Sequence, residues 1–214
     1  MPDEEGALPP LFLFSHGAGA GIESADCAKW IALLSTIGDV KAFNYSFMGG
    51  DVRRKRRAAP RADTLVGEQV AEFERWRAQY PSRPIIMVGR SMGSRVACMA
   101  SDRVDALAVI CLSFPLIGVN GKSRDSELRQ MRIPVLCVQG TRDKMCPIVK
   151  LNTLASELHC RTEIAIMDGG DHALHVTKKL DQNAADQRAL KSIADFVQDI
   201  LPKADNTPLN VAVP

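Results

Sequence analysis

One serine of the chain stands in a setting that predicts nucleophilic chemistry. Residues 89–93 read Gly-Arg-Ser-Met-Gly, which fits the pattern G-x-S-x-G with Ser91 at its centre. The apolar run 84–88 precedes this motif, and a stretch with helical spacing of small and apolar residues follows it. A serine between a strand and a helix sits in a sharp turn that needs small neighbours and lifts the hydroxyl above the sheet. The motif therefore predicts a nucleophile, and an N-cap serine in an ordinary turn is the alternative.

A carboxylate and an imidazole follow later strands of the same pattern. Asp143 comes just after the apolar run 133–139, and His172 lies in a Gly-Gly-Asp-His loop after the run 162–167. Parallel strands bring the loops at their carboxyl ends to one edge of a sheet, so both side chains are expected near Ser91. A histidine would take the proton of the serine, and an aspartate would hold the imidazole in the required tautomer. These residues predict a Ser-His-Asp triad.

Neighbouring residues offer alternatives for both partners of the serine. Asp168 and Asp171 are further candidates for the acid, but neither follows the preceding strand, and Asp171 is better placed to shape its loop. His175 competes with His172 as the base, and that choice stays open. The two histidines are also spaced like a pair of metal ligands, but no second cluster of ligands accompanies them, so we expect no metal.

A loop of small residues follows the first apolar run. Residues 16–21 read His-Gly-Ala-Gly-Ala-Gly, which lets backbone N–H groups approach a substrate oxygen. We expect the N–H groups of Ala18 and Met92 to form a two-donor oxyanion hole. We expect His16 to shape the loop, and we place His16 and Gly17 at the substrate-binding site. The glycines do not follow G-x-G-x-x-G, which disfavours a phosphate-binding loop.

Strands and helices that could position these residues alternate along the chain. Short apolar runs predict buried strands, and stretches with a period of 3.6 residues predict helices. The strands are expected at 11–14, 40–47, 84–89, 106–114, 133–139 and 162–167, and the helices at 24–35, 64–80, 91–101, 147–158 and 183–201. Such alternation predicts a three-layer α/β fold with a mostly parallel sheet of about six strands. The stretch 49–62 has no period and is expected to be a long loop.

Length and composition limit the class of protein. The chain of 214 residues suits one domain, which we place at 1–202, followed by a polar tail at 203–214 that we expect to be disordered. A net charge of +2 creates no general field for nucleic acid. No apolar run approaches the roughly 18 residues that a membrane span needs. The acidic start lacks the pattern of a signal peptide, so we expect a cytoplasmic protein.

Six cysteines are spread through the chain without C-x-x-C spacing, which disfavours a zinc site. Several of them stand among apolar residues, as in the stretch Val109–Leu112. Buried cysteines in an intracellular protein are typically reduced and inert. We therefore expect free thiols and no disulfide framework.

The basic run Arg53–Arg57 is the densest group of charges. It is typical of a nuclear localisation signal or a nucleic-acid patch, which leaves nuclear import open as an alternative location. No aromatic residues interleave it, and the charge of the whole chain is nearly balanced. We therefore favour a solvated loop and expect no nucleic-acid partner.

Four segments together resemble a known family. HGAGAG, GRSMGSR, GTRDKMCP and GGDHALH are similar to the α/β-hydrolases of the dienelactone-hydrolase-like kind. More closely, they resemble a small group of testis-expressed hydrolase-like proteins, which includes a hydrolase-like subunit of a histone acetyltransferase regulatory complex. The resemblance spans about 11–201 and implies the α/β-hydrolase fold.

Two departures from that family matter. A dienelactone hydrolase carries cysteine where this chain has Ser91, so the resemblance does not imply that activity. The two strands that usually open the fold are not found before the run 11–14, which would leave one edge of the sheet bare or covered by a protein partner.

The sequence predicts a serine hydrolase that acts on an ester or related acyl bond of a small molecule, without a cofactor. Fewer than twenty residues separate the expected strands 106–114 and 133–139, which leaves no room for a cap domain. We expect an open site whose acyl pocket is lined by Phe47 and Phe114, with Met48 and the residues after Phe114. A non-catalytic scaffold on the same fold and an acyl transferase are the alternatives.

Overall fold

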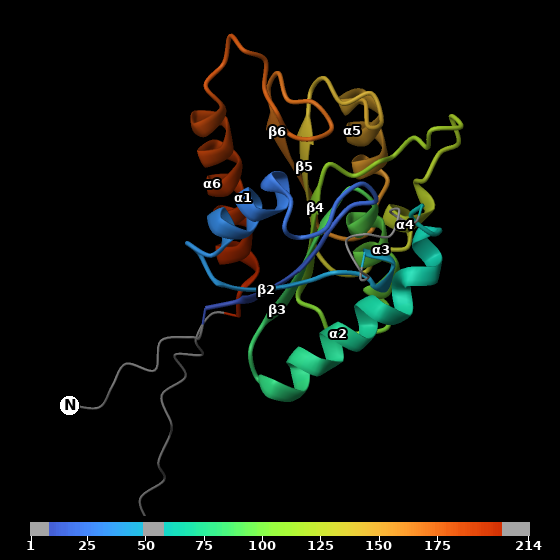
Figure 1. The fold of residues 1–214 in the computed structure, drawn as a ribbon, viewed down its shortest axis with the longest axis vertical. Helices are drawn as coiled ribbons and strands as arrows, with labels where there is room; N and C mark the ends of the chain where they lie inside the picture. The colour runs from blue at the N-terminus through green and yellow to red at the C-terminus, as the bar shows by residue number, and fades with distance from the viewer. Residues whose placement is uncertain (1–8, 49–57, 203–214) are drawn as a thin grey trace, which may run out of the picture.

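A six-stranded sheet forms the centre of the fold in the computed structural model, which describes residues 9–48 and 58–202 (Figure 1). All neighbouring strands are parallel, and their order is β2-β1-β3-β4-β5-β6. The strands are β1 (Leu11–Ser15), β2 (Asp39–Phe43), β3 (Ile85–Arg90), β4 (Ala108–Leu112), β5 (Val135–Gly140) and β6 (Thr162–Met167). The predicted six-stranded α/β fold is confirmed.

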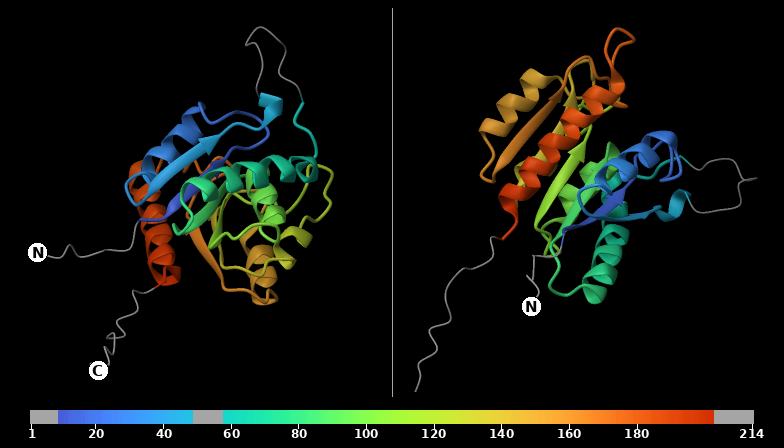
Figure 2. Two further views of the ribbon diagram at one scale, coloured as in Figure 1. Left: turned by 90° about the horizontal axis from the view of Figure 1, so that it is seen from below. Right: turned by 90° about the vertical axis from the view of Figure 1, so that its left-hand side faces the viewer.

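Helices cover both faces of this sheet (Figure 2). One face carries α1 (Ala25–Leu34) and α6 (Gln182–Ile200), and the other carries α2 (Val66–Gln79), α3 (Met92–Ala100), α4 (Ser126–Arg129) and α5 (Ile148–Ser156). Two 3₁₀ turns, η1 (Ser46–Met48) and η2 (Ala62–Leu65), complete the described elements. Within the ranges that the structure describes, none of the helices combines the length and apolar character needed to cross a membrane.

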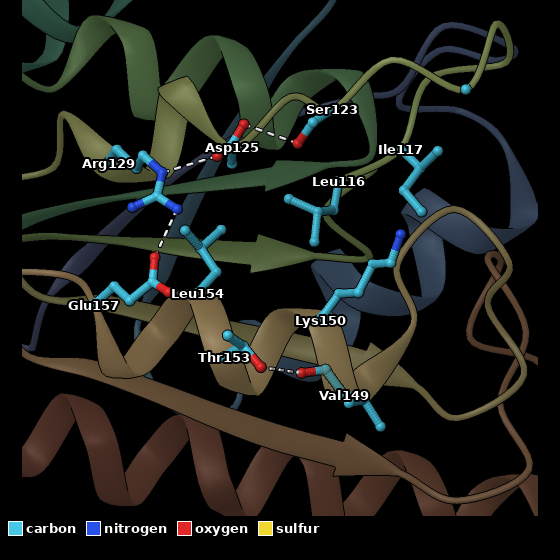
Figure 3. A pocket seen from close by; sticks show the side chains of 11 residues that line it. Leu116, Ile117, Ser123, Asp125, Arg129, Val149, Lys150, Thr153, Leu154 and Glu157 are labelled. Carbon is cyan, nitrogen blue, oxygen red and sulfur yellow. Dashed lines mark hydrogen bonds and ion pairs between the residues drawn. The ribbon is translucent and has the colours of Figure 1, made fainter.

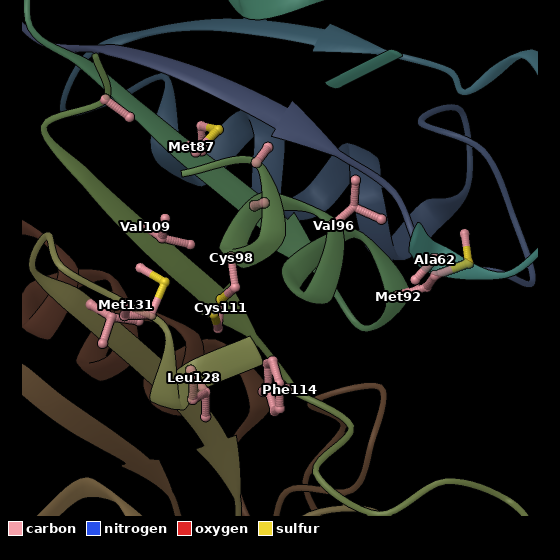
Figure 4. Packing of buried hydrophobic residues seen from close by; sticks show 14 of the residues in the cluster. Ala62, Met87, Met92, Val96, Cys98, Val109, Cys111, Phe114, Leu128 and Met131 are labelled. Carbon is pink, nitrogen blue, oxygen red and sulfur yellow. Dashed lines mark hydrogen bonds between the residues drawn. The ribbon is translucent and has the colours of Figure 1, made fainter. Parts of the chain in front are cut away.

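The strands read as continuous apolar runs because both of their faces are covered. In β1, Leu11 and Leu13 join the core under α2 and α3, whereas Phe12 and Phe14 join the core under α1 and α6. All four side chains are fully buried. Figure 4 shows the first of these cores, where Val96 and Cys98 of α3 lie over the strands. The two cores therefore fix which face of each strand points to which group of helices.

The carboxyl ends of β1, β3 and β4 meet at one edge of the sheet. In the strand register, Ser15 lies beside Gly89, and Arg90 lies beside Leu112. β1 has β2 on one side and β3 on the other, so the chain order reverses at this point of the sheet. Crevices at such a reversal are the usual ligand sites of open α/β sheets. The loop after β1 and the turn after β3 therefore start side by side.

Some expected boundaries were wrong. The strand expected at 40–47 ends at Phe43, and 46–48 form the turn η1. The cause is Tyr45, whose N–H donates to the imidazole of His16 (3.0 Å) instead of to a neighbouring strand. The helix expected at 64–80 begins as the 3₁₀ turn η2, which also shortens the expected loop at 49–62. The helix α4 lies between the expected strands 106–114 and 133–139, where no helix was expected.

Several sequence features fall outside the described residues. These are the basic run Arg53–Arg57, most of the expected loop 49–62 and the tail 203–214. The cysteines, in contrast, all lie within the described residues. All six are free thiols, and five of them are buried. Cys98 and Cys111 approach each other to 3.6 Å between their sulfur atoms in the core that Figure 4 shows.

Gly89 offers a test of the contact between β3 and α3. A Cβ at this position would lie 2.3 Å from backbone atoms of Gly93 and Ser94. We expect Gly89→Ala to lower the unfolding free energy by about 3 kcal/mol, because backbone cannot move aside as a side chain can. Gly67→Ala in α2 is the control, since its Cβ meets nothing within 4 Å and should raise stability by about 0.4–1 kcal/mol. Chemical denaturation measures both, and equal effects would contradict the argument.

Candidate active site

Ser91 occupies a strained turn between β3 and α3. Its backbone has φ 51° and ψ −112°, in a region that residues with a side chain rarely adopt. Its N–H donates to the carbonyl of Leu112 on β4 (2.9 Å), and its carbonyl accepts from the N–H of Ser94 (3.0 Å). These bonds hold the turn to the neighbouring strand and to the first turn of α3. The hydroxyl is thereby fixed at the carboxyl edge of the sheet.

The loop after β1 packs directly on this turn. A Cβ on Gly17 would lie 3.3 Å from the carbonyl oxygen of Arg90 and from the Cβ of Ser91. A Cβ on Gly93 would lie 2.7 Å from the carbonyl oxygens of Ser15 and His16. Both contacts are so close that only glycine fits without a shift. The lack of side chains at 17 and 93 therefore brings the loop against the turn of Ser91.

A chain of two hydrogen bonds joins the three residues of the predicted triad. Ser91 Oγ lies 2.8 Å from His172 Nε2, and His172 Nδ1 lies 2.7 Å from Asp143 Oδ2. A carboxylate accepts only, so Nδ1 carries the ring proton and donates it to Asp143. The lone pair of Nε2 then faces the hydroxyl of Ser91. This arrangement can withdraw a proton from the serine.

The carboxylate of Asp143 is fully buried and accepts from three donors. Oδ2 accepts from His172 and from Gln139 Nε2 (2.6 Å), and Oδ1 accepts from the N–H of Met145 (2.8 Å). Burial raises the pKa of this carboxyl group, but the hydrogen bonds and the electrostatic interaction with His172 outweigh burial. The pKa of Asp143 is therefore below its ordinary value. The group is held in its charged form.

The competing residues bind elsewhere. Asp171 accepts from the N–H groups of Ala173 (2.8 Å) and His175 (3.0 Å), so its carboxylate shapes the loop as expected. Asp168 accepts from the hydroxyl of a threonine (3.4 Å). His175 Nε2 lies 2.7 Å from Asp26 and does not bind Ser91. Across the described parts of the chain, no three His, Cys, Asp or Glu side chains are grouped to hold a metal.

The two residues expected to form the oxyanion hole belong to two segments that meet at Ser91. Met92 is the first residue of α3, and N–H groups of a first helical turn have no partner within their helix. Ala18 is exposed in the loop after β1, directly after Gly17. Their role as donors stays a prediction.

His16 lies beneath this loop as a neutral ring. Its Nδ1–H donates to the carbonyl of Gly17 (2.6 Å), and its Nε2 accepts from the N–H of Tyr45. Burial lowers the pKa of His16, which favours the neutral form. The ring packs against the half-buried ring of Phe47, with centroids 5.5 Å apart. His16 and Phe114 are both fully buried, so the structure places their side chains below the expected substrate site rather than on its surface.

A cavity of about 270 Å³ lies between the segment after β4 and the helix α5 (Figure 3). Leu116 and Ile117, which the sequence places at the acyl pocket, line it together with Leu154 of α5. Arg129 closes one end, where it pairs with Glu157 (2.7 Å). The cavity is therefore lined by these apolar side chains and, toward both of its ends, by charged ones, since Lys150 lies near Ile117 (Figure 3).

A comparison with protein families agrees with this geometry. The model of a family described as an alpha/beta hydrolase domain matches residues 9–200. The chain belongs to this alpha/beta-hydrolase family.

Solved structures of other alpha/beta hydrolases share the fold. Dienelactone hydrolase from Anabaena variabilis superposes with a TM-score of 0.70 and 16% identity, over 92% of this chain and 89% of that one. A serine hydrolase without lid from Xanthomonas campestris gives a TM-score of 0.69 and 16% identity, over 94% and 87%. A serine hydrolase homologue from Coxiella burnetii gives 0.65 and 16%, over 92% and 88%. At this identity the likeness concerns the fold.

Within residues 9–48 and 58–202, this alpha/beta hydrolase has no cap domain. The segment between β4 and β5, where the sequence left no room for a cap, contains the four-residue helix α4 and an isolated bridge between Ile117 and Ser123. The edge of the sheet that carries Ser91 is therefore not covered by an inserted domain at this point of the chain.

Several residues of the site were not found from the sequence. Gln139, which donates to Asp143, is a polar residue within an otherwise apolar strand, and that contrast was an available signal. Asp26 and Arg90, which pair beside Ser91 (3.1 Å), gave no such signal, because their contact joins segments far apart in the chain. The same holds for the bond between His16 and Tyr45.

The lowered pKa of Asp143 predicts how stability depends on pH. The folded-state pKa lies below the unfolded-state value, so the ionised group contributes stability above about pH 4, and this is lost as pH falls through the folded pKa. We expect wild type to be more stable than Asp143→Asn near neutral pH, and the difference to narrow at about pH 3. Denaturant unfolding at both pH values measures this, and parallel curves would contradict it.

Proposed function

We propose that this alpha/beta hydrolase is a serine hydrolase that cleaves an ester or related acyl bond through an acyl-enzyme. Ser91 is the nucleophile, His172 the base, and Asp143 the acid that orients it. The observation that carries this proposal is the pair of hydrogen bonds from Ser91 to His172 (2.8 Å) and from His172 to Asp143 (2.7 Å). The strained backbone of Ser91 supports it, because strain of this kind clusters at functional sites.

In the first step, Ser91 Oγ attacks the carbonyl carbon of the substrate while its proton passes to His172 Nε2. The imidazolium that forms is stabilised by the ionised Asp143, whose buried carboxylate accepts from Nδ1. When the tetrahedral intermediate collapses, the bond to the leaving group breaks, and His172 returns the proton to the leaving oxygen. The acyl group then stays on Ser91.

The negative charge of the tetrahedral intermediate needs fixed donors. We assign this role to the N–H groups of Met92 and Ala18. The N-terminus of α3 adds the positive end of a helix dipole at the position of Met92. Removal of one such donor typically lowers the rate constant by about 10²–10³.

In the second step, water attacks the acyl carbon and gives a proton to His172. The acid is released, and Ser91 recovers its proton from the imidazolium. An acyl transferase would use the same residues with another acceptor in place of water. We favour water, because the segment between β4 and β5 contains only the short helix α4 and no inserted domain that would exclude it.

The substrate class follows from the lack of an inserted domain over the site. Phe47 lies half-buried beside His16 and offers one apolar wall near the nucleophile turn. Without an inserted domain, the site lacks the surface that would enclose a long acyl chain. We therefore assign a small molecule with a short or accessible acyl group as the substrate.

Labelling with a fluorophosphonate probe tests the nucleophile. We expect wild type to be labelled, Ser91→Ala to give no labelling, and His172→Ala to be slower by at least about 10³, because the serine would lose its base. Mass spectrometry of the labelled peptide identifies the modified residue.

Matched substitutions at the opposite edge of the sheet serve as controls. Ser156→Ala at the end of α5 and His159→Ala before β6 remove exposed side chains of the same types and should label like wild type. Folded wild-type protein without any labelling would overturn the proposal and favour the scaffold function. Labelling that survives in Ser91→Ala would assign the reactivity to another residue.

The dependence on acyl length tests the open site. Each methylene that a pocket buries contributes about 0.8 kcal/mol, or roughly a fourfold rise in kcat/KM. We expect kcat/KM of p-nitrophenyl esters to stay level from butyrate to octanoate, because the added methylenes find little surface to contact. A steady fourfold rise with each methylene would instead indicate an enclosed acyl tunnel.

A further inference from the structure

A network of three polar side chains, those of Asp26, Arg90 and His175, ties the turn of Ser91 to the loop of His172. Asp26, in the first turn of α1, accepts from Arg90 Nη2 at Oδ2 (3.1 Å) and contacts His175 Nε2 at Oδ1 (2.7 Å). Arg90 directly precedes Ser91, and His175 follows His172 by three residues. A single carboxylate therefore connects the segments that carry the two residues of the first proton transfer.

Both outer members of this network stand next to strained backbone. Arg90 precedes Ser91 (φ 51°), and His175 follows Leu174 (φ 62°). A left-handed conformation costs a non-glycine residue about 1–3 kcal/mol and persists only where the surroundings hold it. The distance of 2.8 Å between Ser91 and His172 depends on both turns at once. The bonds from Asp26 to Arg90 and to His175 are well placed to keep these two turns at a fixed distance from each other.

Burial gives this network more strength than a surface ion pair. The side chains of Arg90 and Asp26 are 16% and 29% exposed, and that of His175 is 52% exposed. Charges that are partly shielded from water interact more strongly than exposed ones. The planar guanidinium also fixes direction, which an ammonium does not. A Cβ on Gly17 would lie 3.5 Å from Arg90 Nη1, so the guanidinium borders the loop of the oxyanion hole as well.

We propose that Asp26, Arg90 and His175 are positioning residues, which hold the loop of His172 against the turn of Ser91. This inference rests on the proposed serine-hydrolase function. The three side chains act through the geometry of Ser91 and His172, and the expected consequence of breaking the network is a slower chemical step with unchanged binding of substrate.

The main test compares Asp26→Asn with two matched variants. Hydrolysis of p-nitrophenyl acetate should show kcat lower by about tenfold, with KM within about twofold of wild type, because a misplaced base slows chemistry without removing a substrate contact. Asp26→Glu keeps the carboxylate and should recover most of kcat. Asp39→Asn is the control, since Asp39 pairs with Arg83 (2.6 Å) at the amino end of β2, away from Ser91. A rise in KM with unchanged kcat would overturn the positioning role and assign the network to substrate binding.

A double variant tests whether the network acts as a unit. His175→Ala removes a half-exposed side chain, so we expect it to fold, with kcat lower by about threefold. If Asp26 acts on the loop through His175, adding His175→Ala to Asp26→Asn should slow hydrolysis little further. Independent effects that multiply would contradict the network.

Amide hydrogen exchange gives a measure that needs no activity. The N–H groups of Ala173, Leu174 and His175 all donate to Asp171 within the loop of His172. We expect their exchange to be faster in Asp26→Asn and unchanged in Asp39→Asn. If exchange is faster in Asp26→Asn but the wild type is neither labelled nor active as a hydrolase, the serine-hydrolase function is overturned and the positioning role is not. An active wild type whose Asp26→Asn variant matches Asp39→Asn in kcat and in exchange would overturn the positioning role.

Discussion

The close packing of the Ser91 turn is the constraint on which the rest of the site depends. At φ 51° a serine is strained. The turn keeps this conformation because the backbone of β3, α3 and the loop after β1 packs closely around it. The Cβ that Gly89 lacks would lie 2.3 Å from the start of α3, and the one that Gly93 lacks would lie 2.7 Å from the loop after β1. The same glycines that permit the turn bring α3, β3 and the loop together. Ser91 and the two segments that carry the proposed oxyanion donors are thus positioned by one packing arrangement.

The proposed proton transfer also requires that His172 be held close to the hydroxyl of Ser91. His172 stands on a loop after β6, three strands away from β3 in the sheet, so its position depends on side-chain contacts rather than on the sheet alone. Asp143 supplies one of them from the end of β5. Its buried carboxylate stays ionised because Gln139 and the N–H of Met145 donate to it as well. The ends of the strands bring Ser91, Asp143 and His172 to the same edge of the sheet, and the hydrogen bonds fix the distances between their side chains.

Much of the fold, and the approximate position of the three central residues of the site, could be predicted from the sequence. Apolar runs mark β3, β5 and β6, and residues just after them must lie at one edge of a parallel sheet, which is how Ser91, Asp143 and His172 were found. The end of β2 was not predictable, because Tyr45 bonds to a side chain 29 positions earlier. The pairing of Asp26 with Arg90 and His175 likewise spans 64 and 149 positions. Local patterns carry no information on such contacts.

The choice between His172 and His175, which the sequence left open, depends on the backbone between them. Leu174 has φ 62°, so the chain turns sharply after His172, and the two rings face different partners. His172 faces Ser91, whereas His175 faces Asp26. His16 is excluded in another way, since both of its ring nitrogens are engaged by backbone groups and burial keeps it neutral. Among these three histidines, His172 alone has one nitrogen on a carboxylate and the other on a hydroxyl, which is the combination that proton transfer from a serine requires.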